Sequence, residues 1–437
     1  MKAAAALVAA LVFAAPALAA GWPEFGYGPA RQNAGPASTG VTAASIGKLR
    51  RRTIDLDGTV DSSPVYAGGT IYVTTTYGRT EAIDAKTGAV RWRYTPKTYD
   101  SYAGSYRITN MTPTVDPDGS AVYAGAPDGR IRKLAIATGR LLWSTSITRD
   151  PTHEKLTSSL NLSRGLVIAT TGGYIGDAPP YQGHVVTLDS KNGRIVHVWN
   201  SLCANRRGVI QPSTCRSSDS AIWARSGAVV DPSTGNLFVA TGNGPYDGRT
   251  DFGDSVIELS PDASRVIGHW TPPNQAELNT SDLDLGSTAP APLSNGSFVQ
   301  GGKDAELRLV SSGLKTLQTV PTPGTTALFS APAVWRGTWV FVASGSGTEA
   351  WTLRGGRLHA AWSNGNDGTS PVVAGGLLYV QGNEAIRVYR PESGRLVATL
   401  PCGPSHWQSP IVVDGRVVAA EGNANDHATS GVLDIYG

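Results

Sequence analysis

Residues that could carry out acid–base chemistry stand in two irregular stretches near the middle of the 437-residue chain. The stretch SDLDLGSTAP contains Asp282 and Asp284, and the stretch GGKDAEL contains Lys303. Carboxylates two residues apart on an extended chain point to the same face, and one carboxylate within hydrogen-bond reach is enough to accept a hydroxyl proton. A lysine beside it would stabilise developing negative charge. The alternative is that the aspartates are turn or capping carboxylates and that Lys303 forms a surface ion pair of little energetic value.

A third stretch, WARSGAVVDPSTGNLFVATGN, begins at Trp223 and ends at Asn243. An indole offers the flat apolar surface on which a planar ring can stack, and an asparagine amide oxygen is a ligand for hard cations. Both residues also have ordinary explanations. Trp223 would serve equally well in core packing, and Asn243 suits the left-handed position of a Gly-Asn-Gly turn.

The composition limits the fold that can position these stretches. The chain contains 52 Gly and 28 Pro, and only 16% of its residues are charged, against a usual value of about 25%. With 40% apolar residues and 11 Trp, it can bury a large core, which argues against disorder. We therefore expect a turn-rich, all-β protein. The net charge of +3 gives no electrostatic reason to expect nucleic acid as a partner.

The N-terminus has the features of an export signal. Lys2 is followed by an apolar run from Ala3 to Phe13 and by the small-x-small sequence Ala17-Leu18-Ala19. This pattern predicts a cleavable signal peptide over residues 1–19 and a secreted or periplasmic protein. The run is too short for a membrane span, and the absence of a cysteine near the cleavage site argues against a lipid anchor.

The three cysteines fit an oxidising compartment. Cys203 and Cys215 bracket one loop and are expected to form a disulfide, which leaves Cys402 unpaired. The segment CGPSH at Cys402 lacks the second cysteine of a c-type haem attachment motif, so we expect no haem.

A repeated unit organises the rest of the chain. Its clearest copy runs from Ser62 to Trp92 and reads as four short antiparallel strands separated by Gly, Asp and Thr-Gly turns. Eight copies follow one another, and the eighth stops after three strands. An additional strand, Leu49–Leu56, precedes the first copy. These features predict a closed eight-bladed β-propeller over residues 49–437, in which the N-terminal strand completes the last blade. Residues 20–48 would form an extended N-terminal segment.

The pattern A-x-D-x-x-T-G-x-x-x-W at Ala82–Trp92 resembles the tryptophan-docking repeat of the quinoprotein dehydrogenases, which depend on pyrroloquinoline quinone (PQQ), and of their non-enzymatic relatives. The resemblance covers essentially the whole mature chain and implies the eight-bladed fold. It also implies that the repeat tryptophans pack between blades; these are Trp92, Trp143, Trp199, Trp270 and Trp362.

The resemblance also assigns roles to the three irregular stretches. It implies that Trp223 forms the floor under PQQ and that Lys303 contacts the quinone oxygens. It further implies that Asn243 and Asp284 help to bind calcium or a lanthanide ion, with Asp284 also acting as the general base. Two departures from the family pattern weaken this interpretation. Tyr174 occupies the position expected for a glutamate ligand of the metal, and the vicinal cysteine pair common near the cofactor in alcohol-oxidising members of the family is absent. Asp177 is close enough in sequence to replace that ligand.

Two functions remain open on these grounds. The first is a PQQ- and cation-dependent oxidoreductase that acts on an alcohol or sugar hydroxyl. The second is a non-catalytic binding or scaffolding propeller that has lost the cofactor and binds an unknown protein partner. In both cases we expect a monomer with no nucleic acid partner.

Overall fold

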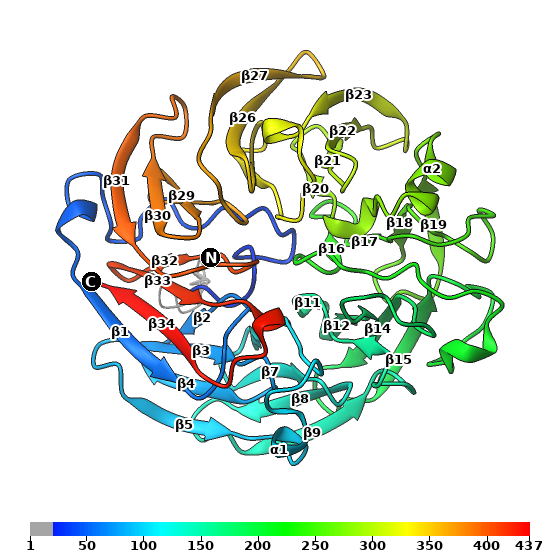
Figure 1. Ribbon diagram of the computed structural model, residues 1–437, viewed down its shortest axis with the longest axis horizontal. Coiled ribbons are helices and arrows are strands. Elements are labelled where there is room, and N and C mark those ends of the chain that lie inside the picture. Colours follow the sequence, from blue (N-terminus) through cyan, green and yellow to red (C-terminus); the bar gives the residue numbers. More distant parts are fainter. Residues whose placement is uncertain (1–20) are drawn as a thin grey trace, which may run out of the picture.

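The computed structural model describes residues 21–437 and shows a ring of eight four-stranded antiparallel sheets around a central axis (Figure 1). The predicted signal peptide lies outside the described residues. The first strand of each sheet is next to the axis and the fourth is at the rim. The predicted all-β, eight-bladed propeller is therefore confirmed. No helix among residues 21–437 is long and apolar enough to cross a membrane.

The strands follow the predicted repeat. Blades 1 and 2 comprise β2–β5 (Val65–Ala67, Thr70–Thr74, Thr80–Asp84, Val90–Tyr94) and β6–β9 (Thr114–Val115, Ala121–Ala126, Arg130–Ala135, Leu141–Ser146). Blades 3 and 4 comprise β11, β12, β14 and β15 (Asn161–Ser163, Leu166–Thr170, His184–Asp189, Ile195–Asn200) and β16–β19 (Val229–Val230, Leu237–Ala240, Val256–Leu259, Val266–Trp270). Blades 5 and 6 comprise β20–β23 (Ala291–Pro292, Phe298–Gln300, Glu306–Val310, Thr316–Pro321) and β24–β27 (Ala333–Trp335, Trp339–Ser344, Gly347–Arg354, Arg357–Asn364). Blades 7 and 8 comprise β28–β31 (Val372–Ala374, Leu377–Gln381, Ala385–Tyr389, Leu396–Pro401) and β32–β34 with β1 (Ile411–Val413, Arg416–Glu421, Gly431–Tyr436, Arg51–Leu56).

The remaining elements are short. They are the helices α1 (Tyr99–Tyr102) and α2 (Gln275–Thr280), the two-stranded ribbon β10 (Glu154–Lys155) with β13 (Gly172–Gly173), and the 3₁₀ turns η1 (Ile46–Lys48), η2 (Pro212–Thr214), η3 (Leu285–Ser287), η4 (Pro323–Thr325) and η5 (Ala424–Asp426).

The repeat tryptophans join neighbouring blades. Trp92 of blade 1 donates a 2.8 Å hydrogen bond from Nε1 to the carbonyl of Ile136 in blade 2. Its ring covers Gly139, where a Cβ would come within 2.5 Å of the indole. The same relationship joins Trp143 to Gly193 in the following blade. The Gly of the Thr-Gly turn is thus required both for its positive φ and for the space that the tryptophan occupies.

The first and last strands of the propeller close the ring. β1 pairs with β34 in antiparallel register from Arg51 opposite Tyr436 to Leu56 opposite Gly431. Arg51 also forms 2.8 Å ion pairs with Glu421 and with the buried Asp434. The prediction that the N-terminal strand completes the eighth blade is confirmed.

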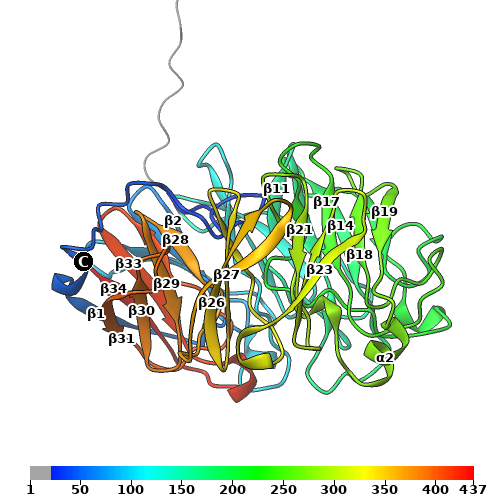
Figure 2. The ribbon, with the colours of Figure 1, turned by 90° about the horizontal axis from the view of Figure 1, so that it is seen from above.

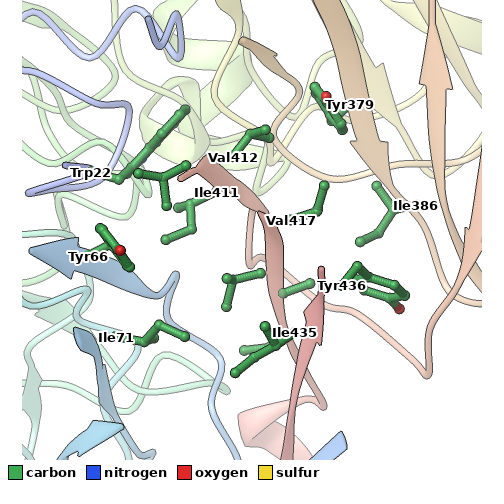
Figure 3. Close-up of a cluster of buried hydrophobic side chains, with 14 of the residues drawn as sticks. Trp22, Tyr66, Ile71, Tyr379, Ile386, Ile411, Val412, Val417, Ile435 and Tyr436 are labelled. Carbon is green, nitrogen blue, oxygen red and sulfur yellow. The ribbon is translucent and has the colours of Figure 1, made fainter. Parts of the chain in front are cut away.

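The core is continuous across this closure. One cluster of buried apolar side chains joins residues of blades 1, 7 and 8 to Trp22 of the N-terminal segment (Figure 3). Tyr66, Ile386, Ile411 and Ile435 belong to it, and none of these side chains is more than 4% exposed. The N-terminal segment is therefore packed into the core.

The segment before β1 crosses one end of the central channel (Figure 2). The backbone of Trp22 exchanges hydrogen bonds of 2.9 and 2.8 Å with Tyr66 of β2. Further along, the backbone carbonyls of Pro29, Gln32 and Asn33 accept hydrogen bonds from the inner strands of blades 4, 6 and 7. The segment that was predicted as merely extended therefore ties the inner strands together at their C-terminal ends.

Candidate functional site

A cavity of about 490 Å³ lies at the opposite end of the channel. Its wall is built mainly from segments that lead into the inner strands of several blades, and the N-terminal ends of those strands point toward it. Residues far apart in the sequence meet here because equivalent positions of all blades converge on the axis. The lining residues are Lys155, Ile175, Gly176, Asp177, Trp223, Arg225, Asp282, Asp284, Ser287, Lys303, Phe329, His406, Trp407 and Asn425.

Lys303 forms ion pairs with both predicted carboxylates. Its Nζ lies 2.5 Å from Oδ2 of the buried Asp284 and 2.9 Å from Oδ1 of the exposed Asp282. Burial lowers the pKa of Lys303, but the two carboxylates outweigh it and hold this pKa above its ordinary value. The lysine is therefore a fixed positive charge at this side of the cavity.

Asn243 belongs to the same cluster, although it does not line the cavity itself. Its backbone N–H donates a 2.7 Å hydrogen bond to Asp284 Oδ1, and its Nδ2 donates a 2.8 Å hydrogen bond to Asp282 Oδ1. The side-chain oxygen Oδ1 of Asn243 is buried and accepts no hydrogen bond from the described residues. The amide oxygen therefore has unmet bonding capacity beside two carboxylates.

Gly242 holds Trp223 and Asp284 close together. A Cβ at this glycine would overlap Asp284 Oδ1 and would lie 3.0 Å from the indole Nε1 of Trp223. The structure thus brings together the four residues that the sequence analysis selected, which are Trp223, Asn243, Asp284 and Lys303. Their proposed roles stay predictions.

Further carboxylates surround this cluster. Asp177 lines the cavity and accepts a 3.1 Å hydrogen bond from the hydroxyl of Tyr181. Burial and the charge of Asp284 raise the pKa of Asp177. Burial raises the pKa of Asp254, which is fully buried, to about 8. Both carboxyl groups near the Asp284–Lys303 pair therefore hold their proton to a higher pH than usual.

Tyr174 does not line the cavity. Its hydroxyl accepts a 3.3 Å hydrogen bond from Arg107 Nε and donates to the carbonyl of Pro151 at 3.2 Å. Asp177, three residues later, is the acidic residue of this loop that reaches the cavity. Among residues 21–437, no three Asp, Glu, His or Cys side chains lie close enough together to hold a metal ion by themselves.

Two further cations of the cavity wall, Lys155 and Arg225, were not predicted from the sequence. Lys155 and Arg225 are only 3% and 6% exposed, and neither forms an ion pair with a carboxylate within residues 21–437. Burial lowers the pKa of Lys155 to about 7 and that of Arg225 to about 10. Both residues shortly precede an inner strand, β11 and β16 respectively. That position in the repeat is the signal that could have revealed them.

An aromatic wall continues from Arg225. The guanidinium of Arg225 lies 4.5 Å from the ring centre of Trp407, and His406 stacks on the same ring at 3.6 Å. The Nδ1 atom of His406 donates a 2.7 Å hydrogen bond to the buried Asp61. The cavity thus joins a cationic and aromatic half to an acidic half that contains Asp284 and Lys303.

The disulfide predicted between Cys203 and Cys215 is present, and Cys402 is free and buried. The disulfide is connected to the loop of Asp177, because Gln182 Nε2 donates to Cys215 Sγ at 3.4 Å.

The architecture is that of an eight-bladed propeller of four-stranded antiparallel sheets. The family model described as outer membrane protein assembly factor BamB matches residues 41–225. A quinohemoprotein alcohol dehydrogenase of Pseudomonas putida is 25% identical over 240 residues, which are 50% of this chain and 34% of that protein. The dehydrogenase subunit of the quinone-dependent alcohol dehydrogenase of Gluconobacter oxydans is 23% identical over 286 residues, 57% of this chain and 37% of that subunit. The chain thus spans little more than a third of the length of these curated relatives.

Solved structures show the same fold. The quinohemoprotein alcohol dehydrogenase of Comamonas testosteroni superposes with a TM-score of 0.73 at 16% identity, covering 95% of this chain and 80% of that one. A europium-containing methanol dehydrogenase gives a TM-score of 0.73 at 13% identity, covering 95% of this chain and 98% of that one. The predicted resemblance to the PQQ-like propeller repeat family is confirmed.

Proposed function

We propose that this chain is an exported quinoprotein oxidoreductase, which binds PQQ in the cavity and oxidises the hydroxyl group of an alcohol or sugar. The observation that carries the proposal is the pair of buried, unpaired cations Lys155 and Arg225, which line the same cavity as two tryptophans and the Asp284–Lys303 ion pair. The relatives named as quinone-dependent alcohol dehydrogenases support the same chemistry.

The cationic half of the cavity fits a planar polyanion. Burying a charge without a counterion is costly, so Lys155 and Arg225 favour a ligand that brings negative charge. PQQ is a planar aromatic tricarboxylate, and Trp223 and Trp407 offer it flat surfaces. Arg225 suits a carboxylate particularly well because its guanidinium can donate two parallel hydrogen bonds.

The acidic half supplies oxygen ligands of the kind that a hard cation prefers. Asn243 Oδ1, with no donor, and the carboxylates of Asp177 and Asp284 are the groups that would hold calcium or a lanthanide ion. Because three protein carboxylates do not converge among the described residues, such an ion would need further oxygen ligands from the cofactor. Asp177 then takes the place of the glutamate that Tyr174 does not provide.

A bound quinone of this type supplies the two-electron acceptor for the oxidation. In the proposed reaction Asp284 accepts the proton of the substrate hydroxyl, because it is the buried carboxylate that reaches the cavity. Asn243 and Lys303 keep its two oxygens in place. Lys303 also offers positive charge to the reduced cofactor.

Export to the periplasm or the medium rests on the predicted signal peptide. The substrate is then a small molecule that enters from the open end of the cavity. We propose that the chain carries no haem, although two of the similar proteins described above are named as quinohemoproteins.

Titration of the purified protein with PQQ tests this function. Cofactor absorbance and melting temperature are followed with calcium, with a lanthanide and with a chelator present. We expect saturable changes in both signals, weakened by R225M and unaffected by K315R, which alters an exposed lysine in the turn between β22 and β23. If neither signal changes under any of the metal conditions, the protein is not a PQQ enzyme.

A second candidate is a non-catalytic binding propeller. It is favoured by the match to the assembly-factor model over residues 41–225 and by the neutral Tyr174 at the expected ligand position. In that case the cavity binds no quinone, and the loops around it contact a protein partner. The same titration separates the two candidates, because this one predicts no PQQ-dependent change in melting temperature.

A further inference from the structure

Lys155 is a buried amine that faces a cavity without a counterion. It lies on β10, is 3% exposed and lines the wall of the cavity. Its neighbour Glu154 is engaged elsewhere, because its Oε1 lies 2.9 Å from His184 Nε2 and its Oε2 accepts from Thr148. Adjacent strand residues point to opposite faces, so Glu154 does not neutralise the lysine.

The surroundings of Lys155 favour its neutral form. Burial is the largest cause and the positive charge of Arg225 the next, while the charge of Asp61 opposes them less strongly. Together they lower the pKa of Lys155 to about 7. Lys303 in the same cavity has two carboxylate partners, and its pKa is raised instead. The protein therefore presents one reactive amine and one ammonium ion to the same space.

We propose that Lys155 is a nucleophile that forms an imine with carbonyl compounds entering the cavity, with 2-oxo acids as the preferred class. The neighbouring Arg225 selects this class because its guanidinium can bind the carboxylate while the adjacent carbonyl carbon meets the amine. Desolvation and a neighbouring cation are the features that activate lysines for this chemistry.

The chemical step balances without an oxidant or reductant. The lone pair of Lys155 Nζ attacks the carbonyl carbon and forms a C–N bond while the carbonyl π bond breaks, and one proton passes from the nitrogen to the oxygen to give a neutral carbinolamine. The C–O bond of the carbinolamine then breaks, and the hydroxyl group leaves as water with the second nitrogen proton as the C=N bond forms. Hydrolysis reverses both steps and releases the amine.

This inference is independent of the proposed oxidoreductase function. A polyanionic cofactor would occupy the same half of the cavity and would hold Lys155 as an ammonium ion. Bound PQQ is therefore expected to protect the lysine from carbonyl compounds, and imine formation itself needs no quinone.

Reductive trapping tests the inference. The full-length purified protein is incubated with glyoxylate and sodium cyanoborohydride, which converts an imine into a stable secondary amine, and the labelled lysines are identified by peptide mass spectrometry. At pH 7 about half of an amine with a pKa near 7 is neutral, against less than about 0.1% of an ordinary lysine. We expect Lys155 to be labelled at least tenfold faster than the exposed Lys97 and Lys315.

Matched variants give the controls. K155R keeps the charge but removes the amine, and should abolish the fast labelling. R225M removes the carboxylate anchor and the neighbouring charge, and should slow labelling of Lys155 at least fivefold while K315R leaves it unchanged. Melting temperatures establish that each variant is folded. Label confined to exposed lysines, or labelling of Lys155 no faster than theirs, overturns the inference. A failed PQQ titration with rapid labelling of Lys155 would reject the oxidoreductase and leave this inference standing.

Discussion

Gly242 and Asp284 are in such close contact that a Cβ at position 242 would overlap the carboxylate Oδ1. The glycine precedes Asn243 in the loop between β17 and β18, and the aspartate precedes η3. The same Cβ would also lie 3.0 Å from Trp223 Nε1. Gly242 therefore sets the spacing between the indole and the carboxylate at the proposed site.

Replacing Gly242 with alanine should displace Asp284 and weaken PQQ binding. Because the added methyl group meets a carboxylate that is already held by Asn243 and Lys303, we expect at least a tenfold increase in the dissociation constant. Isothermal titration calorimetry would measure it. Gly47, which has no heavy atom within 4 Å of its Cβ position, is the matched control, and G47A should bind as the wild type does. Equal affinity of G242A and wild type would contradict the proposed geometry.

PQQ affinity should decrease as the pH rises above 7. In the free protein the pKa of Lys155 is about 7, so above that pH the amine is mostly neutral. An anionic ligand requires the ammonium form, and its binding must then take up a proton. The dissociation constant should rise by up to about tenfold per pH unit between pH 7 and 9. The K155R variant keeps its charge, so a slope that persists in K155R would exclude Lys155 as its source.

Asp254 should make the folded protein less stable at alkaline pH. Burial raises its pKa from 3.8 to about 8 in the folded state, so the folded state binds a proton that the unfolded chain releases near pH 4. The stability that this proton provides is full below about pH 4 and is lost progressively as the pH rises through 8. D254N should therefore raise the melting temperature more at pH 8.5 than at pH 5. Calorimetric scans at both values would show this, and an equal change at the two pH values would speak against the assignment.

A glycine in a Thr-Gly turn can be required for its positive φ or for the space that the tryptophan ring occupies, and a substitution at Gly139 distinguishes these two requirements. G139A should destabilise the protein by roughly 1 to 3 kcal/mol more than G119A, by analogy with overpacked cores. Both glycines have φ near 70°, but only Gly139 has a neighbour, the indole of Trp92, within reach of a Cβ. The difference between the two variants in chemical denaturation therefore isolates the packing effect. Equal stabilities would mean that the backbone conformation alone accounts for the glycine.

Much of the fold could be predicted from local patterns. The unit from Ser62 to Trp92 contains all four strands of its blade, and Trp92 meets a turn of the next unit, which the repeat itself supplies. The pairing of β1 with β34 followed from counting strands, because a unit with three strands leaves an edge for a fourth. The path of the segment before β1 was not predicted, since its hydrogen bonds to the inner strands leave no periodic pattern.

The sequence by itself determined the eight-bladed ring, because strand alternation and turn residues are patterns that extend over only a few positions. It also indicated that Trp223, Asn243, Asp284 and Lys303 lie close together, because the family resemblance identified the three stretches that contain them. Only the tertiary structure decided that Asp177 and not Tyr174 reaches the cavity, and that Lys155 and Arg225 face it without counterions. These outcomes depend on how blades distant in sequence converge at the axis. Whether a charge is buried and unpaired is a property of all the residues around it, and no short segment contains that information.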